Sequence, residues 1–185
     1  MSDIIKNESL FVITGGPGAG KTAVIQELEH RGFAVVAEVA RQIIQEQVRA
    51  RGNSVPWGDT KSYTELMLSR SIESFLTLKQ ASLPTFCDRG IPDVLCYARI
   101  ISLPEVREIL SACEQFRYNR RVFMLPPWPE VYRTDTERKQ TFQEAVQVYQ
   151  EMVRVYEHCG YAISEVPRAR VELRAAFVLD SLRSL

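Results

Sequence analysis

A short apolar run at residues 10–14 leads directly into a glycine-rich turn with the sequence GGPGAGKT. Glycine adopts backbone conformations with positive φ at little steric cost, so such a turn can curl tightly and direct several N–H groups at one point. Residues 20–31 then follow a helical pattern, and Gly32 is suited to end that helix. The stretch therefore predicts a strand, a tight turn and a helix in immediate succession, which excludes most all-α and all-β folds.

The turn matches the pattern Gly-x-x-x-x-Gly-Lys-Ser/Thr, known as the P-loop or Walker A pattern. In such a loop the backbone N–H groups and the positive end of the following helix hold the phosphates of a nucleoside triphosphate. Lys21 can reach the β- and γ-oxygens, and the Thr22 hydroxyl can bind Mg²⁺. We therefore expect ATP and Mg²⁺ as cofactors, although GTP also fits the motif. The expected binding residues are Gly15, Gly16, Pro17, Gly18, Ala19, Gly20, Lys21 and Thr22.

Strand and helix patterns alternate along the whole chain. Short runs rich in β-branched and aromatic residues predict strands, and apolar residues at spacings of three and four predict helices. Strand followed by helix, repeated five times, predicts an α/β fold of the P-loop NTPase type, with a five-stranded parallel sheet and helices on both faces. The expected strands are 10–14, 33–37, 84–88, 121–125 and 161–166; the expected helices are 20–31, about 39–50, about 60–81, two within 91–117, about 136–158 and about 167–184.

Length and composition narrow the choice of function. The 185 residues fit a single domain spanning 1–185. The 23 basic and 23 acidic residues balance, so no overall field favours nucleic acid or an anionic membrane. There is no apolar run of the roughly 18 to 20 residues that cross a membrane, and no secretory signal pattern. Four cysteines without a Cys-x-x-Cys pair argue against zinc. We expect a cytoplasmic protein without nucleic-acid or membrane partners.

The motifs of the large NTPase classes are missing from the sequence. The Asn-Lys-x-Asp tetrapeptide that GTPases use to read guanine does not occur, nor does the Leu-Ser-Gly-Gly signature of transporter ATPases. AAA-type motors place a glutamate after the Walker B aspartate, whereas Asp88 here is followed by Arg89. The small-molecule kinases remain.

Charged residues follow two of the expected strands. Glu38 comes at the end of the second strand and Arg41 one helical turn later, while Asp88 and Arg89 end the third strand. Because ligands of such sheets bind at the carboxyl ends of the strands, we expect these side chains to meet at the phosphate loop. A carboxylate there can accept a hydroxyl proton or hold Mg²⁺, and an arginine can neutralise phosphate. The alternative is that the carboxylates are solvated strand ends or helix caps.

The segment PPWPEVYRTDTERKQ at 126–140 follows the fourth strand. In nucleoside and nucleotide kinases this connection is a lid that brings arginines over the phosphates. Arg133 and Arg138 flank a predicted capping box, Thr134-x-x-Glu137, at the start of the next helix. They are candidates for the lid arginines, with a solvated charged face as the alternative. Trp128 could form a wall of an acceptor pocket or anchor the core.

The chain resembles the small P-loop ATPases that carry an AAA label. Those proteins in turn look like the nicotinamide riboside kinase domain and, more distantly, deoxynucleoside kinases. The segments that carry the resemblance are the phosphate loop, EVAR, FCDRG, LPPWPEVYRTDTER and CGYAISEVP. The resemblance implies that Glu38 is the general base and that Asp88 and Arg89 serve magnesium and the phosphates, with Asp88 as a metal ligand. Gly90 stands where deoxynucleoside kinases have serine, so the nucleoside as acceptor stays open.

Two functions therefore remain open. The first is a Mg²⁺-dependent kinase that moves the γ-phosphoryl of ATP to a small hydroxylated acceptor such as a nucleoside. Its expected catalytic residues are Lys21, Glu38, Asp88, Arg89, Arg133 and Arg138. The second is a nucleotide-binding switch or slow ATPase that acts through a protein partner. The acceptor, the oligomeric state, and the choice between Glu38 and Asp88 as base are not fixed by the residues alone.

Overall fold

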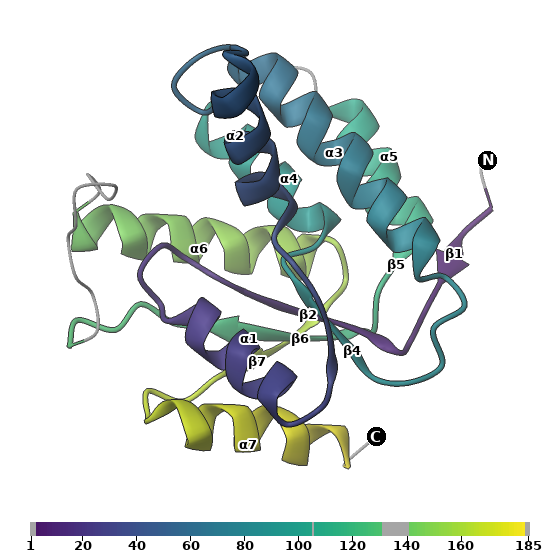
Figure 1. Cartoon of the computed structure of the whole chain (residues 1–185), viewed down its shortest axis with the longest axis vertical. Helices are drawn as coiled ribbons and strands as arrows, with labels where there is room; N and C mark the ends of the chain where they lie inside the picture. The colour runs from purple at the N-terminus through teal and green to yellow at the C-terminus, as the bar shows by residue number, and fades with distance from the viewer. Residues whose placement is uncertain (1–2, 105, 131–140, 184–185) are drawn as a thin grey trace.

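A five-stranded parallel sheet forms the centre of the computed structural model, which describes residues 3–104, 106–130 and 141–183. Its strand order is β3-β4-β2-β6-β7, which confirms the expected sheet (Figure 1). The carboxyl ends of neighbouring strands lie at one edge, where Ile13 is in register with Asp88 and Gly15 with Leu125. The strands are β2 (Leu10–Gly15), β3 (Ala34–Val36), β4 (Thr85–Asp88), β6 (Arg121–Leu125) and β7 (Ala162–Glu165).

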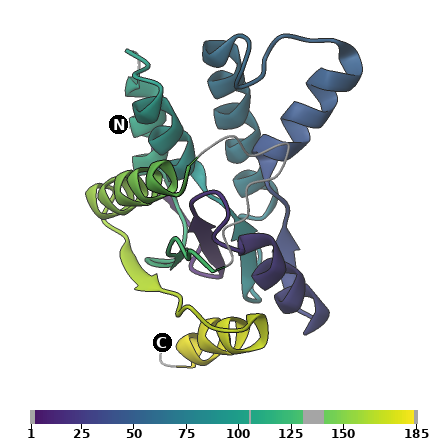
Figure 2. The ribbon, with the colours of Figure 1, turned by 90° about the vertical axis from the view of Figure 1, so that its left-hand side faces the viewer.

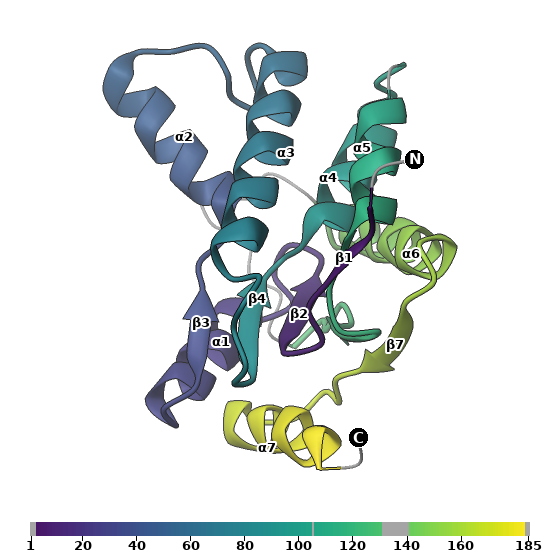
Figure 3. The same ribbon diagram turned by 90° about the vertical axis from the view of Figure 1, so that its right-hand side faces the viewer.

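Helices cover both faces of the sheet, as expected. Two helices, α1 (Lys21–His30) and α7 (Val171–Leu182), pack together on one face. The remaining helices lie on the other side, far from α7 (Figures 1 and 3). In Figure 2 the blue helices α2 and α3 stand at the opposite end of the molecule from the yellow α7. This second group is α2 (Val39–Ala50), α3 (Thr60–Thr77), α4 (Ile91–Ile100), α5 (Arg107–Gln115) and α6 (Phe142–His158).

The central strand β2 shows why the sheet has an apolar core on each side. Successive side chains of a strand point to opposite faces. Leu10 and Val12 pack into the cluster beneath α3, α4 and α6, while Phe11 and Ile13 pack against α1 and α7. All four are buried, as a parallel sheet between two helical layers requires.

Several element boundaries differ from those expected. Helix α6 begins at Phe142, later than 136, because Thr141 and Glu144 form a capping box. The Glu144 amide donates to the Thr141 hydroxyl at 3.2 Å, and the Glu144 carboxylate accepts from the Thr141 amide at 2.6 Å. The expected box at Thr134 and Glu137 lies outside the described residues. Helix α3 ends at Thr77 instead of about 81, and α7 begins at Val171 instead of about 167.

A small second sheet was not expected from the sequence. Strand β1 (Ile5–Lys6) pairs in parallel with β5 (Phe116–Arg117), and each strand has only two residues. Strands this short carry too little periodicity to stand out in the sequence.

The described part of the chain contains no helix that is both long and apolar enough to cross a bilayer. Cys87, Cys96 and Cys113 are buried thiols, and Cys159 is half-buried. Nowhere in residues 3–104, 106–130 or 141–183 do three or more His, Cys, Asp or Glu side chains form a group able to hold a metal ion without a further ligand.

Candidate active site

The phosphate loop connects β2 to α1 with close backbone packing. A Cβ atom on Gly15 would lie 2.7 Å from the carbonyl oxygen of Leu125, so only glycine lets β2 and β6 approach this closely. Gly20 has a φ of 77°, the left-handed conformation that favours glycine, and the first residue of α1 follows it. The loop therefore directs the positive end of α1, with its free N–H groups, at the carboxyl edge of the sheet.

Lys21 is the first residue of α1, and its side chain lies beside two carboxylates. It is only 7% exposed. Its Nζ donates a hydrogen bond to Asp88 and lies 3.8 Å from Oε2 of Glu38. Burial and the nearby Arg89 cation lower the pKa of Lys21, and the two carboxylates only partly offset them. The lysine predicted to reach the phosphates is thus held by two acids.

Glu38 precedes α2 at its N-cap position, but its carboxylate does not cap the helix. Instead, Oε1 of Glu38 accepts a hydrogen bond from Nε of Arg89 at 2.6 Å. Burial acts to raise the pKa of Glu38, but the Arg89 and Lys21 cations outweigh it and lower that pKa overall. Glu38 is therefore a half-buried carboxylate that stays ionised at neutral pH, and the helix-cap alternative is wrong for its side chain.

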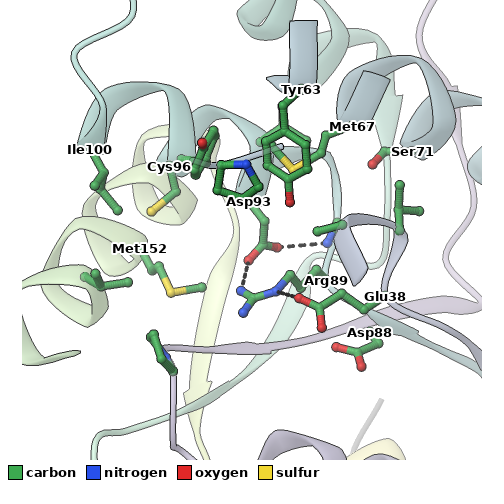
Figure 4. Close-up of a pocket in the computed structure, with 18 of the residues that line it drawn as sticks. Glu38, Tyr63, Met67, Ser71, Asp88, Arg89, Asp93, Cys96, Ile100 and Met152 are labelled. Atoms are coloured by element: carbon green, nitrogen blue, oxygen red, sulfur yellow. Dashed lines mark hydrogen bonds and ion pairs between the residues drawn. The ribbon is translucent and has the colours of Figure 1, made fainter. Parts of the chain in front are cut away.

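Arg89 has a strained backbone, with a φ of 74°. A non-glycine residue in this region costs about 1–3 kcal/mol, and such residues are concentrated at functional sites. Its amide donates to the carbonyl of Ile13 at 3.0 Å, which fixes the turn against β2. Its guanidinium lies between Glu38 and Asp93, with Nη1 donating to Asp93 at 3.0 Å (Figure 4). Although burial acts to lower the pKa of Arg89, these carboxylates raise it, so the group stays charged.

Asp93, which was not among the expected site residues, holds this arrangement together. It is 9% exposed and lies in the first turn of α4. Its carboxylate accepts from the Thr14 hydroxyl at 2.6 Å, the Gly90 amide at 2.9 Å and the Tyr156 hydroxyl at 2.5 Å, as well as from Arg89. One buried carboxylate thus joins β2, α4 and α6 and orients the guanidinium that binds Glu38.

Asp88 ends β4 and lies at the same edge. Burial raises its pKa, and the Lys21 cation only partly opposes that effect. Thr22 is the second residue of α1, and its side chain is exposed. Carboxylate and hydroxyl oxygens are ligands that suit Mg²⁺, which also keeps several waters and takes phosphate oxygens. The donor set of Asp88 and Thr22 therefore fits the magnesium ion of a nucleotide complex.

A cavity of about 370 Å³ lies directly beside these charged groups. Helices α2, α3, α4 and α6 supply most of its walls, and Pro17 of the phosphate loop reaches its rim. Figure 4 shows Tyr63, Met67, Cys96 and Met152 around the cavity, with Glu38 and Arg89 toward its charged end. The remaining apolar lining residues are Val39, Ala40, Pro56, Val94, Tyr97, Ile100, Ile101 and Val148.

The other residues that the sequence singled out are placed differently. Arg41 is exposed and contributes only weakly to the low pKa of Glu38. Trp128 is not among the cavity residues, so the expectation that it walls an acceptor pocket is wrong; its ring centre instead lies 5.9 Å from the guanidinium carbon of Arg174. Arg133 and Arg138 lie outside the described residues.

Solved structures with the same architecture include two kinases and the NadR protein. Thymidylate kinase from Ehrlichia chaffeensis has a TM-score of 0.62 and 15% identity, over 96% of this chain and 100% of that one. NadR, solved in complex with NR, has a TM-score of 0.72 and 13% identity, over 96% of this chain and 51% of that one. Deoxyadenosine kinase from M. mycoides, with products bound, has a TM-score of 0.59 and 14% identity, over 95% and 100%.

These similarities show the P-loop kinase-like fold that was expected. No curated protein matches the sequence. One family model does match it, described as an AAA domain, and it covers residues 10–174. That span runs from the start of β2 into α7 and includes the phosphate loop, Glu38, Asp88, Arg89 and Asp93. The chain belongs to this AAA-domain family and has the kinase-like form of the P-loop fold.

Proposed function

We propose that the protein is a Mg²⁺-dependent kinase that transfers the γ-phosphoryl of ATP to a hydroxyl of a small acceptor. The observation that carries this proposal is the cavity of about 370 Å³ beside Glu38, Asp88 and Arg89. A switch or slow ATPase needs a phosphate loop and a place for water, but it has no need of a largely apolar pocket for a second molecule. A kinase needs such a pocket, for its acceptor, next to its general base.

The charged residues have separate tasks in this reaction. The phosphate loop and Lys21 would hold the phosphates, and Thr22 and Asp88 would hold Mg²⁺, which would neutralise phosphate charge. Glu38 accepts the proton of the acceptor hydroxyl; its Oε1 is oriented by Arg89, and its Oε2, which has no hydrogen bond to Arg89 and lies 3.8 Å from Nζ of Lys21, receives the proton. Because Glu38 is ionised at neutral pH, it needs no prior deprotonation.

The charges around the cavity indicate the class of acceptor. Arg89 is the cation among the described lining residues, and both Glu38 and Asp93 already engage it. Asp88 adds a further negative charge, and most of the other lining side chains are apolar. An acceptor that carries a phosphate would meet three carboxylates there, and the two cations beside them, Arg89 and Lys21, are already paired with these acids. We therefore propose an unphosphorylated acceptor with an apolar ring and a free hydroxyl, such as a nucleoside, in the manner of deoxyadenosine kinase more than of thymidylate kinase.

The lid arginines test how the kinase would stabilise its transition state. An arginine that stabilises the charge of the transition state is worth about 10³–10⁵ in turnover. It contributes much less to binding of the ground state. Arg133→Ala and Arg138→Ala, made singly, should therefore reduce acceptor phosphorylation strongly for at least one of the two, with a small change in ATP affinity. If both variants keep full acceptor phosphorylation, neither arginine is a catalytic lid residue; if the wild type itself phosphorylates no acceptor, the switch replaces the kinase.

Lys21→Ala tests the nucleotide site on which the proposal depends. Isothermal titration with Mg·ATP should detect no tight binding to this variant, while its thermal unfolding shows an intact fold. Lys79→Ala is the matched control, because Lys79 is an exposed lysine just beyond the end of α3. Unchanged ATP affinity in a folded Lys21→Ala variant would remove the basis of the proposal.

A further inference from the structure

Arg174 lies in the first half of α7, against the back of the phosphate loop. It is 4% exposed, although nothing in the sequence distinguishes it from a surface arginine. Its Nη2 donates a hydrogen bond to the carbonyl oxygen of Ala19 at 2.7 Å. A Cβ atom on Gly20 would lie 2.7 Å from Nη1 of Arg174, so the guanidinium fills the space that the glycine leaves open. The arginine therefore packs directly on the Ala19–Gly20 turn.

The charge of Arg174 has no counter-charge among the described residues. No carboxylate lies within ion-pair distance, and its buried Nε has no hydrogen-bond partner in that part of the chain. The nearest aromatic ring, that of Trp128, is 5.9 Å from the guanidinium carbon and offers a weak attraction. Buried arginines are normally paired with an acid, because an unpaired buried charge is costly.

The position of Arg174 near two helix N-termini makes the cost of burying its unpaired charge larger. It follows closely on the N-terminus of α7 at Val171, and the Ala19–Gly20 turn that it touches leads into the N-terminus of α1 at Lys21. Both helix ends carry partial positive charge, which disfavours a cation nearby. Burial also lowers the pKa of Arg174. A cation held where two positive helix ends converge becomes favourable when an anion binds at the same loop.

We propose that Arg174 is a positioning residue of the triphosphate site, which fixes the Ala19–Gly20 turn from α7 and supplies uncompensated positive charge for the phosphates. This inference rests on the proposed nucleotide binding and extends it to a helix outside the loop motif. It predicts that the affinity lost when Arg174 is replaced increases with the number of phosphates on the ligand. A purely structural arginine would affect nucleosides and nucleotides alike.

The test compares the affinities of Arg174→Met and Arg174→Gln for ATP, ADP and adenosine by isothermal titration. Methionine removes the charge and the hydrogen bond, whereas glutamine removes the charge and keeps a donor for Ala19. A hydrogen bond to a charged group is worth about 1.5–3 kcal/mol, or about 10- to 100-fold in affinity. We expect losses of that size for ATP with methionine, smaller losses for ADP and little change for adenosine. Arg183→Met, on the exposed end of the same helix, is the control.

Each outcome has one meaning. If a folded Arg174→Met variant binds ATP as tightly as the wild type, or loses ATP and adenosine affinity equally, the inference is wrong. If methionine prevents folding, Arg174→Gln gives the same comparison, and an unchanged preference for ATP over adenosine overturns the inference. If the wild type itself binds neither ATP nor ADP, the proposed function fails. A wild type that prefers ATP and an Arg174→Met variant that keeps this preference leave the function standing and remove only the role of Arg174.

Discussion

The phosphate loop has a side that faces the cavity and a side that faces α7, and the two differ in how charge is arranged. On the cavity side, Lys21 and Arg89 lie among Glu38, Asp88 and Asp93, and every cation has at least one carboxylate partner. On the α7 side, Arg174 is more deeply buried than Arg89 but has no carboxylate partner among the described residues. The first arrangement is complete without a ligand, whereas the second is not.

This difference in charge pairing indicates that the two sides of the phosphate loop have separate tasks. A network in which each charge has a partner keeps its geometry before the substrate arrives, and such preorganisation is what general-base chemistry requires. A buried cation without an acidic partner carries an uncompensated desolvation cost and gains its counter-charge only when an anion binds. We therefore expect substitutions on the cavity side to change rate and stability, and those on the α7 side to change nucleotide affinity.

The largest expected effect on the cavity side is that of Glu38→Gln. Glutamine keeps the size of the side chain but cannot accept the proton, and loss of a general base costs about 10²–10⁴ in rate. ATP affinity should be nearly unchanged, which single-turnover kinetics and titration can separate. Glu46→Gln on the same helix is the control, because Glu46 is exposed and pairs with Arg70, away from the site. If Asp88→Asn loses the rate and Glu38→Gln does not, the two roles are reversed.

The next largest effect should be the loss of stability in Asp93→Ala. The substitution removes the acceptor of four donors: Nη1 of Arg89, the Thr14 and Tyr156 hydroxyls and the Gly90 amide. Breaking a buried ionic network in this way costs about 3–5 kcal/mol, measurable as a lower free energy of unfolding in urea.

Asp59→Ala is the matched control for that variant. Asp59 caps α3 by accepting from the Ser62 amide at 3.0 Å in an exposed setting. Loss of such a cap costs about 1 kcal/mol. If Asp93→Ala is no more destabilising than Asp59→Ala, then Asp93 does not hold the cavity side together.

A smaller effect is expected on the pH profile of Arg89→Met. The ionised form of Glu38 is the active one, so turnover is lost as pH falls through its pKa, which Arg89 and Lys21 hold below the ordinary value of 4.5. Without the Arg89 cation that pKa rises, and the acid limb of kcat should move to higher pH. Arg41→Met should move it less, because the influence of Arg41 is weaker. An acid limb that Arg89→Met leaves in place would show that another group sets it.

The sequence alone was sufficient to predict the parallel sheet and the charged residues at the carboxyl ends of its strands. Short apolar runs and one phosphate-loop pattern predicted β2, β4 and β6, and the rule that ligands bind at carboxyl ends brought Glu38, Asp88 and Arg89 together. These inferences depend on local periodicity and on topology, which the order of residues determines directly. The catalytic roles of these residues stay predictions.

Contacts between distant segments could not be predicted in the same way. Asp93 had a local signal, because it stands three residues after Gly90 and caps α4, but its bonds to Thr14 and Tyr156 arise only from packing of α4 and α6. Arg174 had no signal at all, since its burial depends on how α7 docks on the loop. The start of α6 was placed too early because the capping box of Thr141 with Glu144, a second pattern of the same kind, was not recognised in the sequence.

The most direct test of the account is the mass of the product made from ATP, Mg²⁺ and a library of unphosphorylated and phosphorylated metabolites. We predict that an unphosphorylated hydroxyl compound gains one phosphoryl group, that ADP forms in equal amount, and that Glu38→Gln nearly abolishes both. Conversion of ATP to ADP and free phosphate alone, at a rate that neither the library nor Glu38→Gln changes, would contradict the claim that the cavity holds a phosphoryl acceptor.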